Sequence, residues 1–134
     1  MTNFFPSALN EGEMRVMKKS NTILLLDSNN ESKIINALLN RGFLVSIHHK
    51  MQRALQKLFH EKFAAIFISS DFSNDGDMLE FVLNARDVEV QIPIFIIGNL
   101  AYKQEEKVLL KLPNTYHYDT MKELENIEIQ EIIN

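Results

Sequence analysis

Four histidines are the side chains of this sequence best suited to metal binding or general acid–base chemistry. His48 and His49 are adjacent, and neighbours on a β-strand point to opposite faces, so the two cannot bind one ion together. His60 and His117 are single residues with no carboxylate at a fixed local spacing, so nothing visible in the sequence supports a charge-relay arrangement. The spacing predicts surface or strand-end histidines rather than a catalytic or metal site.

Nucleophiles and phosphate-binding loops give no stronger signal. Ser69 and Ser70 have no identifiable base, the chain has no cysteine, and it has no Gly-x-x-x-x-Gly-Lys-[Ser/Thr] loop to hold a nucleotide. We therefore expect a protein that is not an enzyme and has no cofactor. An unrelated small enzyme on the same fold is the minor alternative.

Length and composition indicate one folded domain. The 134 residues are enough for a single core, and 46% apolar with 24% charged residues is ordinary for a soluble protein. The apolar runs are far shorter than the ~20 residues of a membrane span. No charged-then-apolar signal peptide follows the N-terminus. A cytoplasmic location, without membrane contact, is the expectation.

The charge pattern argues against direct binding of nucleic acid, because the net charge is −4 and such binding normally needs a basic face. Residues 31–62 are nevertheless rich in Lys and Arg, whereas residues 119–134 are rich in acids. Two solvated faces of opposite sign, or a partner-binding surface, would both produce this asymmetry.

Residues 1–20 mix Asn, Ser, Pro, Gly and charges without an apolar period, which predicts a flexible N-terminal leader. The leader is either native or an extension before an alternative start at Met17. Residues 21–134 are expected to form the folded domain.

Short apolar runs predict five β-strands, at residues 23–26, 44–47, 64–68, 93–97 and 115–118. Capping-box spacings open the first and last helices, at Ser28 with Glu31 and at Thr120 with Glu123, and Gly42 closes the first. The predicted apolar helix faces are Ile34, Ile35, Leu38 and Leu39; Met51, Ala54, Leu55, Leu58 and Phe59; Met78, Leu79, Val82 and Leu83; residues 102–112; and Met121, Leu124 and Ile127.

Five alternations of strand and helix predict the fold class. Right-handed crossovers between successive strands give a parallel sheet. We expect an α/β fold with a five-stranded, doubly wound parallel sheet of order 2-1-3-4-5 and helices on both faces.

Over residues 22–134 this order of elements resembles the receiver domain of two-component response regulators. In that family, adjacent acids after the first strand and an aspartate after the third hold Mg²⁺ and accept a phosphoryl group. The matching positions here are Asp27-Ser28 and Ser69, so one carboxylate and the acceptor are missing. Asp71 becomes a displaced acceptor only if the alignment slips.

The switch positions of the family are also replaced. Gly98 stands where the family has Ser or Thr, and Tyr118-Asp119 replaces its Lys-Pro. The resemblance therefore implies a vestigial phosphorylation pocket without a metal ion, made of Asp27, Ser28, Ser69, Asp71 and Gly98.

A closer resemblance is to the N-terminal domain of FleQ and FlrA flagellar regulators, which are sigma-54-dependent bacterial activators. Residues 92–98, Ile-Pro-Ile-Phe-Ile-Ile-Gly, resemble that family's fourth strand. Pro113 and Tyr118, leading to Met121 and Leu124, resemble its loop into the last helix. The resemblance implies a pseudo-receiver that regulates and dimerises a transcription factor, whose ATPase and DNA-binding domains belong to a longer chain. Whether this chain is an excised domain or free-standing stays open.

Two alternatives remain open beside that interpretation. One is an atypical receiver that still accepts phosphate or signals without it. The other is the receiver-like wing domain of a basic-amino-acid decarboxylase, whose fourth strand has a similar proline-to-glycine run.

Self-association is the expected mode of action, because receiver-like domains commonly pair through their fourth and fifth helical faces. The expected homodimer surface consists of Tyr102, Val108, Leu109 and Tyr118. The last helix is acidic and would repel its own copy, so we place the contact nearer the fourth helix.

Overall fold

The computed structural model describes residues 20–27, 33–69, 78–89, 91–98, 103–120, 122–123 and 129–133, with the backbone alone at 103–106 and 130. The predicted leader, apart from Ser20, lies outside the described residues. So do both residues of the first predicted capping box.

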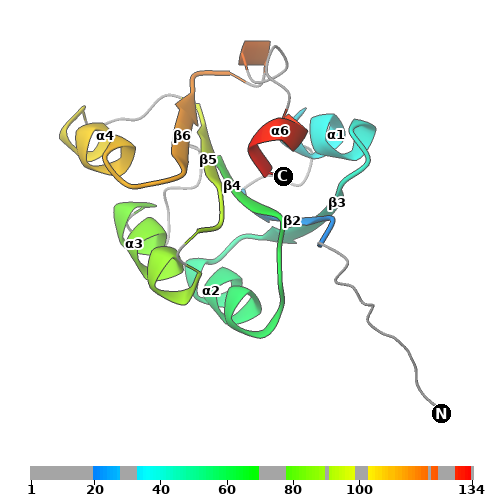
Figure 1. Cartoon of the computed structure of the whole chain (residues 1–134), viewed down its shortest axis with the longest axis horizontal. Helices are drawn as coiled ribbons and strands as arrows, with labels where there is room; N and C mark the ends of the chain where they lie inside the picture. The colour runs from blue at the N-terminus through cyan, green and yellow to red at the C-terminus, as the bar shows by residue number, and fades with distance from the viewer. Residues whose placement is uncertain are drawn as a thin grey trace.

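Strands and helices alternate along the chain as predicted (Figure 1). The strands are β2 (Thr22–Leu26), β3 (Leu44–His48), β4 (Ala65–Ser69), β5 (Ile94–Ile97) and β6 (Thr115–Tyr118). The helices are α1 (Lys33–Asn40), α2 (Met51–His60), α3 (Met78–Val88), α4 (Lys103–Leu110) and α6 (Ile129–Ile133).

The strands form one parallel sheet of order β3-β2-β4-β5-β6. Counted along the chain this is the order 2-1-3-4-5, so the predicted fold class is confirmed. Figure 1 shows α1 and α6 on one face of the sheet and α2, α3 and α4 on the other. Because both faces are covered, strand residues of both orientations are withdrawn from water.

The core therefore has two halves, one on each side of the sheet. In β2, Leu24 and Leu26 pack on the side of α2, α3 and α4, whereas Ile23 and Leu25 pack on the side of α1 and α6. All four side chains are fully buried. The continuous apolar run in the sequence is thus explained by alternation between two apolar layers.

Gly42 ends α1, as predicted, with a left-handed backbone at φ 89°. Its N–H donates to the Leu39 carbonyl at 3.0 Å, and the Phe43 N–H donates to the Leu38 carbonyl at 3.1 Å. This pair of bonds is the Schellman arrangement, which uses a residue of positive φ and so favours glycine. The buried Phe43 side chain then directs the chain into β3.

Three apolar residues that were assigned to buried helix faces are exposed instead: Leu39, Leu83 and Phe59. In α2 the buried residues are Ala54 and Leu58, which are four residues apart. Phe59 lies about 100° further round the helix and is 73% exposed. The error arose from treating every neighbouring apolar residue as part of one face.

Arg86, near the end of α3, is a buried charge that connects the segments leading into two strands. Its Nη1 donates to the Ile92 carbonyl at 2.5 Å, and its Nη2 donates to the Pro113 carbonyl at 2.6 Å and the Asn114 carbonyl at 2.8 Å. Nη2 also contacts Thr115 Oγ1 at 3.1 Å. One guanidinium thus fixes the segments that lead into β5 and β6.

Among the described residues, no helix combines the length and the apolar character needed to cross a bilayer.

Candidate functional site at the carboxyl edge of the sheet

The positions that carry chemistry in the receiver comparison come together where the parallel strands end. Leu26 pairs with Ile68, so Asp27 and Ser69 follow at the same level on the neighbouring strands β2 and β4. Ser69 in turn pairs with Ile97, the residue before Gly98. The predicted convergence of Asp27, Ser69 and Gly98 is therefore present in the structure.

Asp27 is buried and is held by its backbone on the side toward β3. Its N–H donates to the His48 carbonyl at 3.1 Å, and His49 Nδ1 donates to the Asp27 carbonyl at 2.6 Å. The first turn after β2 is thus tied to the end of β3. Ser28, which stands where the receiver family has its second adjacent acid, lies outside the described residues.

Ser69 is the last residue of β4 and is 7% exposed. A hydroxyl therefore stands at the strand end where a receiver presents its acceptor carboxylate. The predicted alignment of Ser69 with that strand end agrees with the observed end of β4. Asp71, the displaced acceptor in the alternative alignment, lies outside the described residues.

Gly98 is hydrogen-bonded to β6 through both its N–H and its carbonyl group. It has a φ of 116°, its N–H donates to the Tyr118 carbonyl at 2.8 Å, and its carbonyl accepts from His117 Nε2 at 2.6 Å. Gly98 offers no hydroxyl to a phosphoryl group, and the left-handed φ favours glycine at this point. These hydrogen bonds hold the end of β5 against β6.

One prediction about the histidines needs correction. His117 does have a nearby carboxylate, since Asp119 Oδ1 lies 3.7 Å from His117 Nε2. The same Nε2 donates its hydrogen to the Gly98 carbonyl, so the ring is held by the backbone. The pair was missed because the two residues are only two positions apart at the end of a strand, where the chain leaves the sheet.

The described donors at this edge do not fit a magnesium site of the receiver type. Asp27 and Asp119 follow β2 and β6, which are separated by three strand spacings, or about 14 Å. Between them the described side chains contribute the Ser69 hydroxyl. No group of three or more His, Cys, Asp or Glu residues within the described part of the chain could hold a metal ion. Mg²⁺ prefers oxygen ligands clustered in octahedral geometry, and the described residues do not provide that cluster.

The predicted dimer surface is only partly available at the surface. Leu109 is fully buried in the core against α3 and the sheet, so its assignment to an interface is wrong. Val108 and Leu110, on either side of it, are 44% and 47% exposed. The assignment failed at one residue because α4 uses Leu109 as its inward contact. Tyr102 lies outside the described residues.

Tyr118 is half-buried against the aromatic rings on the α1 and α6 side of the sheet. Its ring stacks on Phe95 at a centroid distance of 6.4 Å, and Phe95 also stacks on Phe67 at 4.6 Å and Tyr116 at 5.3 Å. Burial, with a smaller contribution from Tyr116, raises the pKa of the Tyr118 phenol. Part of this side chain is therefore used for packing inside the domain.

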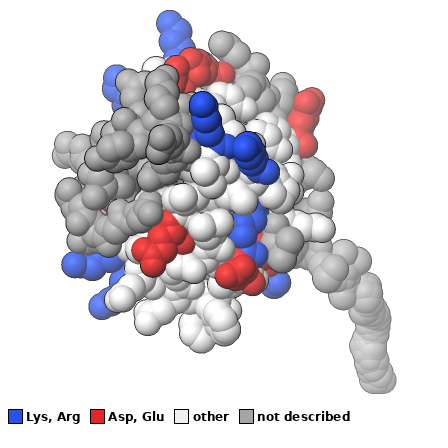
Figure 2. Space-filling model, turned by 90° about the vertical axis from the view of Figure 1, so that its left-hand side faces the viewer, with Lys and Arg blue, Asp and Glu red and all other residues white. Residues whose placement is uncertain are grey.

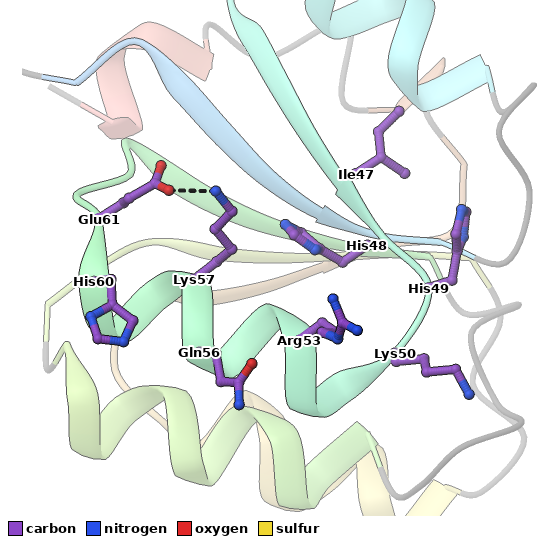
Figure 3. A pocket seen from close by; sticks show the side chains of 9 residues that line it. All are labelled: Ile47, His48, His49, Lys50, Arg53, Gln56, Lys57, His60 and Glu61. Carbon is purple, nitrogen blue, oxygen red and sulfur yellow. Dashed lines mark hydrogen bonds and ion pairs between the residues drawn. The ribbon is translucent and has the colours of Figure 1, made fainter.

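A second site was not anticipated from the sequence. A pocket of about 590 Å³ lies between the end of β3 and α2, and His48, His49, Arg53 and Lys57 are among its lining residues (Figure 3). The signal in the sequence was the excess of basic residues between positions 31 and 62. Charge counting showed the excess, but only the fold places strand-end and helix residues around one hollow.

Comparison with known proteins places the fold. No protein-family model matches the sequence, and no curated protein matches it. Among solved structures, a CheY-like receiver domain protein from Methanospirillum hungatei JF-1 has a TM-score of 0.68 at 17% identity, over 87% of this chain and 94% of that one. The fold is that of response-regulator receiver domains.

Two further structures illustrate the range of this receiver-like fold. The receiver domain of sensor histidine kinase PA1611 from Pseudomonas aeruginosa PAO1, with a magnesium ion in its active-site cleft, has a TM-score of 0.68 at 21% identity, over 85% of this chain and 98% of that one. A streptococcal redox sensor, of a family that evolved from two-component response regulators, has a TM-score of 0.66 at 18% identity, over 84% of this chain and 50% of that one. At such identities the likeness establishes the fold, and the chemistry must come from the residues of this chain.

Proposed function

We propose that this receiver-like chain is a non-catalytic pseudo-receiver, a regulatory and dimerisation domain that does not use aspartyl phosphorylation. The observation that carries the proposal is the buried Ser69 at the end of β4. A serine hydroxyl lacks the carboxylate that forms an acyl phosphate. Gly98 removes a second contact to a phosphoryl group, since it has no hydroxyl.

The wider assignment follows from the resemblance to FleQ and FlrA regulators. On that basis residues 21–134 form the regulatory domain of a cytoplasmic bacterial transcription regulator, and residues 1–20 form a leader. ATPase and DNA-binding domains of a longer chain would then be its partners. The Pseudomonas aeruginosa receiver has magnesium in its cleft, and the proposal for this chain is a domain that works without such an ion.

A receiver fold that has adopted another input has a structural precedent. The streptococcal protein is described as one of a family of redox sensors that evolved from response regulators. This chain has no cysteine, so a thiol-based signal does not apply to it. The precedent supports a receiver-like domain that responds to a signal other than phosphoryl transfer. The signal of this chain must be inferred from the residues of its own sites.

The dimer surface in this proposal is the outer side of α4, with Leu110 in place of the buried Leu109. Val108 and Leu110 are exposed apolar residues there, and Leu83 and Val88 are exposed on the neighbouring α3. Figure 2 shows the side of the molecule that carries α3 and α4, where a largely uncharged area lies among acidic and basic groups. An apolar area with a charged border suits a modest protein contact.

Treatment of the full chain with Mg²⁺ and phosphoramidate, followed by intact-mass spectrometry, tests the absence of phosphoryl chemistry. We expect no phosphorylated species. A hydroxylamine-sensitive adduct that maps to an aspartate would overturn the proposal in favour of an atypical phosphate-accepting receiver. A receiver domain with an intact acidic site serves as the positive control for the phosphodonor.

A further inference from the structure

The pocket at the β3 edge of the sheet is distinct from the carboxyl-edge positions discussed above. It is open to solvent and has a volume of about 590 Å³, within the range of about 300–1,000 Å³ usual for small-molecule sites. Figure 3 shows side chains from the end of β3, the following turn and α2 around this hollow. The lining residues are Ile47, His48, His49, Lys50, Arg53, Gln56, Lys57, His60 and Glu61.

The lining is strongly basic in a chain of net charge −4. Lys50, Arg53 and Lys57 are permanent cations, and Glu61 is the one carboxylate among the described lining residues. Glu61 Oε2 lies 2.5 Å from Lys57 Nζ, at the end of the pocket away from Lys50 (Figure 3). Both partners of this ion pair are about half exposed, so the pair is solvated and can rearrange.

Two imidazoles add donors that respond to an anion. His48 Nε2 lies 2.9 Å from Ser46 Oγ. His49 Nδ1 donates to the Asp27 carbonyl, which leaves Nε2 as the ring nitrogen available to a ligand. Burial lowers the pKa of His48, and Lys57, His49 and Arg53 lower it further, against an opposing effect of Glu61.

Charge, size and donor type select one class of ligand. A guanidinium and two ammonium groups bind phosphate and carboxylate oxygens through charge-assisted hydrogen bonds. We propose that this pocket binds a small polyanion, a molecule that carries at least two phosphate or carboxylate groups. The His49 bond to the Asp27 carbonyl joins the pocket to the first turn of the carboxyl edge, so the ligand contacts a residue tied to that edge.

The proposal does not depend on the absence of phosphorylation. Isothermal titration of the full chain with inorganic pyrophosphate and, separately, with citrate tests it. We expect binding of one or both probes. Pyrophosphate alone identifies phosphate recognition, citrate alone identifies carboxylate recognition, and both together identify recognition of charge. No binding of either probe would overturn the proposal.

Substitutions locate the site. Arg53→Gln combined with Lys57→Gln removes two cations from exposed positions of α2 and is expected to weaken binding at least tenfold, because charge-assisted hydrogen bonds are stronger than neutral ones. The matched control is Lys107→Gln with Lys111→Gln, two exposed lysines at and just beyond α4, which should leave the affinity within about twofold. Equal losses in the two variants would mean a general charge effect and would reject the pocket.

The pH dependence gives an independent readout. Binding should tighten as the pH falls from 8 to 5.5, because a bound anion favours the protonated form of His48. The charged and titratable groups around His48 are Lys50, Arg53, Lys57, His60 and Glu61 from the turn, α2 and its end, with His49 and Asp27 on the sheet side. An affinity that stays flat over this range would contradict a role for His48.

Discussion

At the scale of single residues, the described carboxyl edge of the sheet pairs one carboxylate with a serine hydroxyl. Asp27 and Ser69 lie at the same level on adjacent strands, and both are buried. A second carboxylate at position 69 would stand close to Asp27 without a described cation between them. Neighbouring buried carboxylates raise each other's pKa and cost stability unless a metal ion neutralises them. Serine avoids that cost.

Arg86 holds the segments before β5 and β6, at the end of the sheet opposite the carboxyl edge. Arg86→Ala removes the donors to three backbone carbonyls and should lower the free energy of unfolding by about 3 kcal/mol. Urea denaturation measures this change. Arg53→Ala, at an exposed position of α2, is the control and should cost less than about 0.5 kcal/mol. Similar midpoints for the two variants would contradict the role of Arg86 as an anchor.

His48 should make stability depend on pH in the weakly acidic range. Burial, followed by Lys57, lowers the pKa of His48 in the folded state, so the unfolded chain binds the proton more readily. Stability therefore falls as the pH drops below about 6.5, the ordinary value, toward the lower folded pKa.

The variant His48→Gln isolates that contribution. Its loss of stability between pH 8 and pH 5.5 should be smaller than that of the wild type, as measured by thermal denaturation. At pH 8 the imidazole is neutral in both states, so any difference there reports packing and the Ser46 hydrogen bond. An unchanged slope in the variant would show that another group is responsible.

At the scale of elements, the sequence indicated each of the described strands and most of the described helix positions. The runs at 23–26 and 115–118 gave β2 and β6 to within a residue, because strands covered on both faces are continuously apolar or begin after a turn. The error at Leu109, and at Phe59 in α2, concerned which side of a helix faces inward. That choice depends on how the helix is rotated against the sheet, which local periodicity does not determine.

The candidate sites were predictable to different degrees. Asp27, Ser69 and Gly98 could be placed because each directly follows a predicted strand, and parallel strands end at one edge. The basic pocket could not, because it joins the end of an edge strand to three turns of the next helix. Its residues are scattered over a charged segment, and tertiary packing decides which of their side chains point toward the same hollow.

Adjacent residues of α2 test the observed helix rotation. Leu58→Ala should lower the free energy of unfolding by about 2–5 kcal/mol, because the leucine is buried in the core. Phe59→Ala should change it by less than about 0.5 kcal/mol, because that ring is mostly exposed. Chemical denaturation of both variants compares them directly. A larger loss at Phe59 than at Leu58 would mean that the helix is rotated differently.

At the scale of the whole molecule, the basic pocket and the α4 surface lie at opposite sides of the sheet. The pocket lies beside β3 and α4 lies beside β6, and these are the two outer strands. Asp27, Ser69 and Gly98 follow the strands between them, and Asp27 is hydrogen-bonded to His49 of the pocket. A polyanion bound beside β3 would thus leave the α4 surface accessible. This division suits a domain that senses at one edge and assembles at the other.

The α4 surface has a direct test at this scale. Val108→Glu with Leu110→Glu should weaken self-association at least tenfold, because two exposed apolar side chains become charged. Leu44→Glu, at an exposed position on the opposite sheet edge, is the matched control and should not change it. Equal weakening by the control would place the contact elsewhere.

The central claim is assembly without phosphoryl chemistry, and sedimentation equilibrium of the full chain tests it most directly. The measurement covers a concentration series with and without Mg²⁺ and beryllofluoride, a mimic of the acyl phosphate. We predict a dimer whose dissociation constant is the same in both conditions. A dissociation constant that changes with the mimic would contradict the account, and a monomer in both conditions would contradict its dimeric assembly.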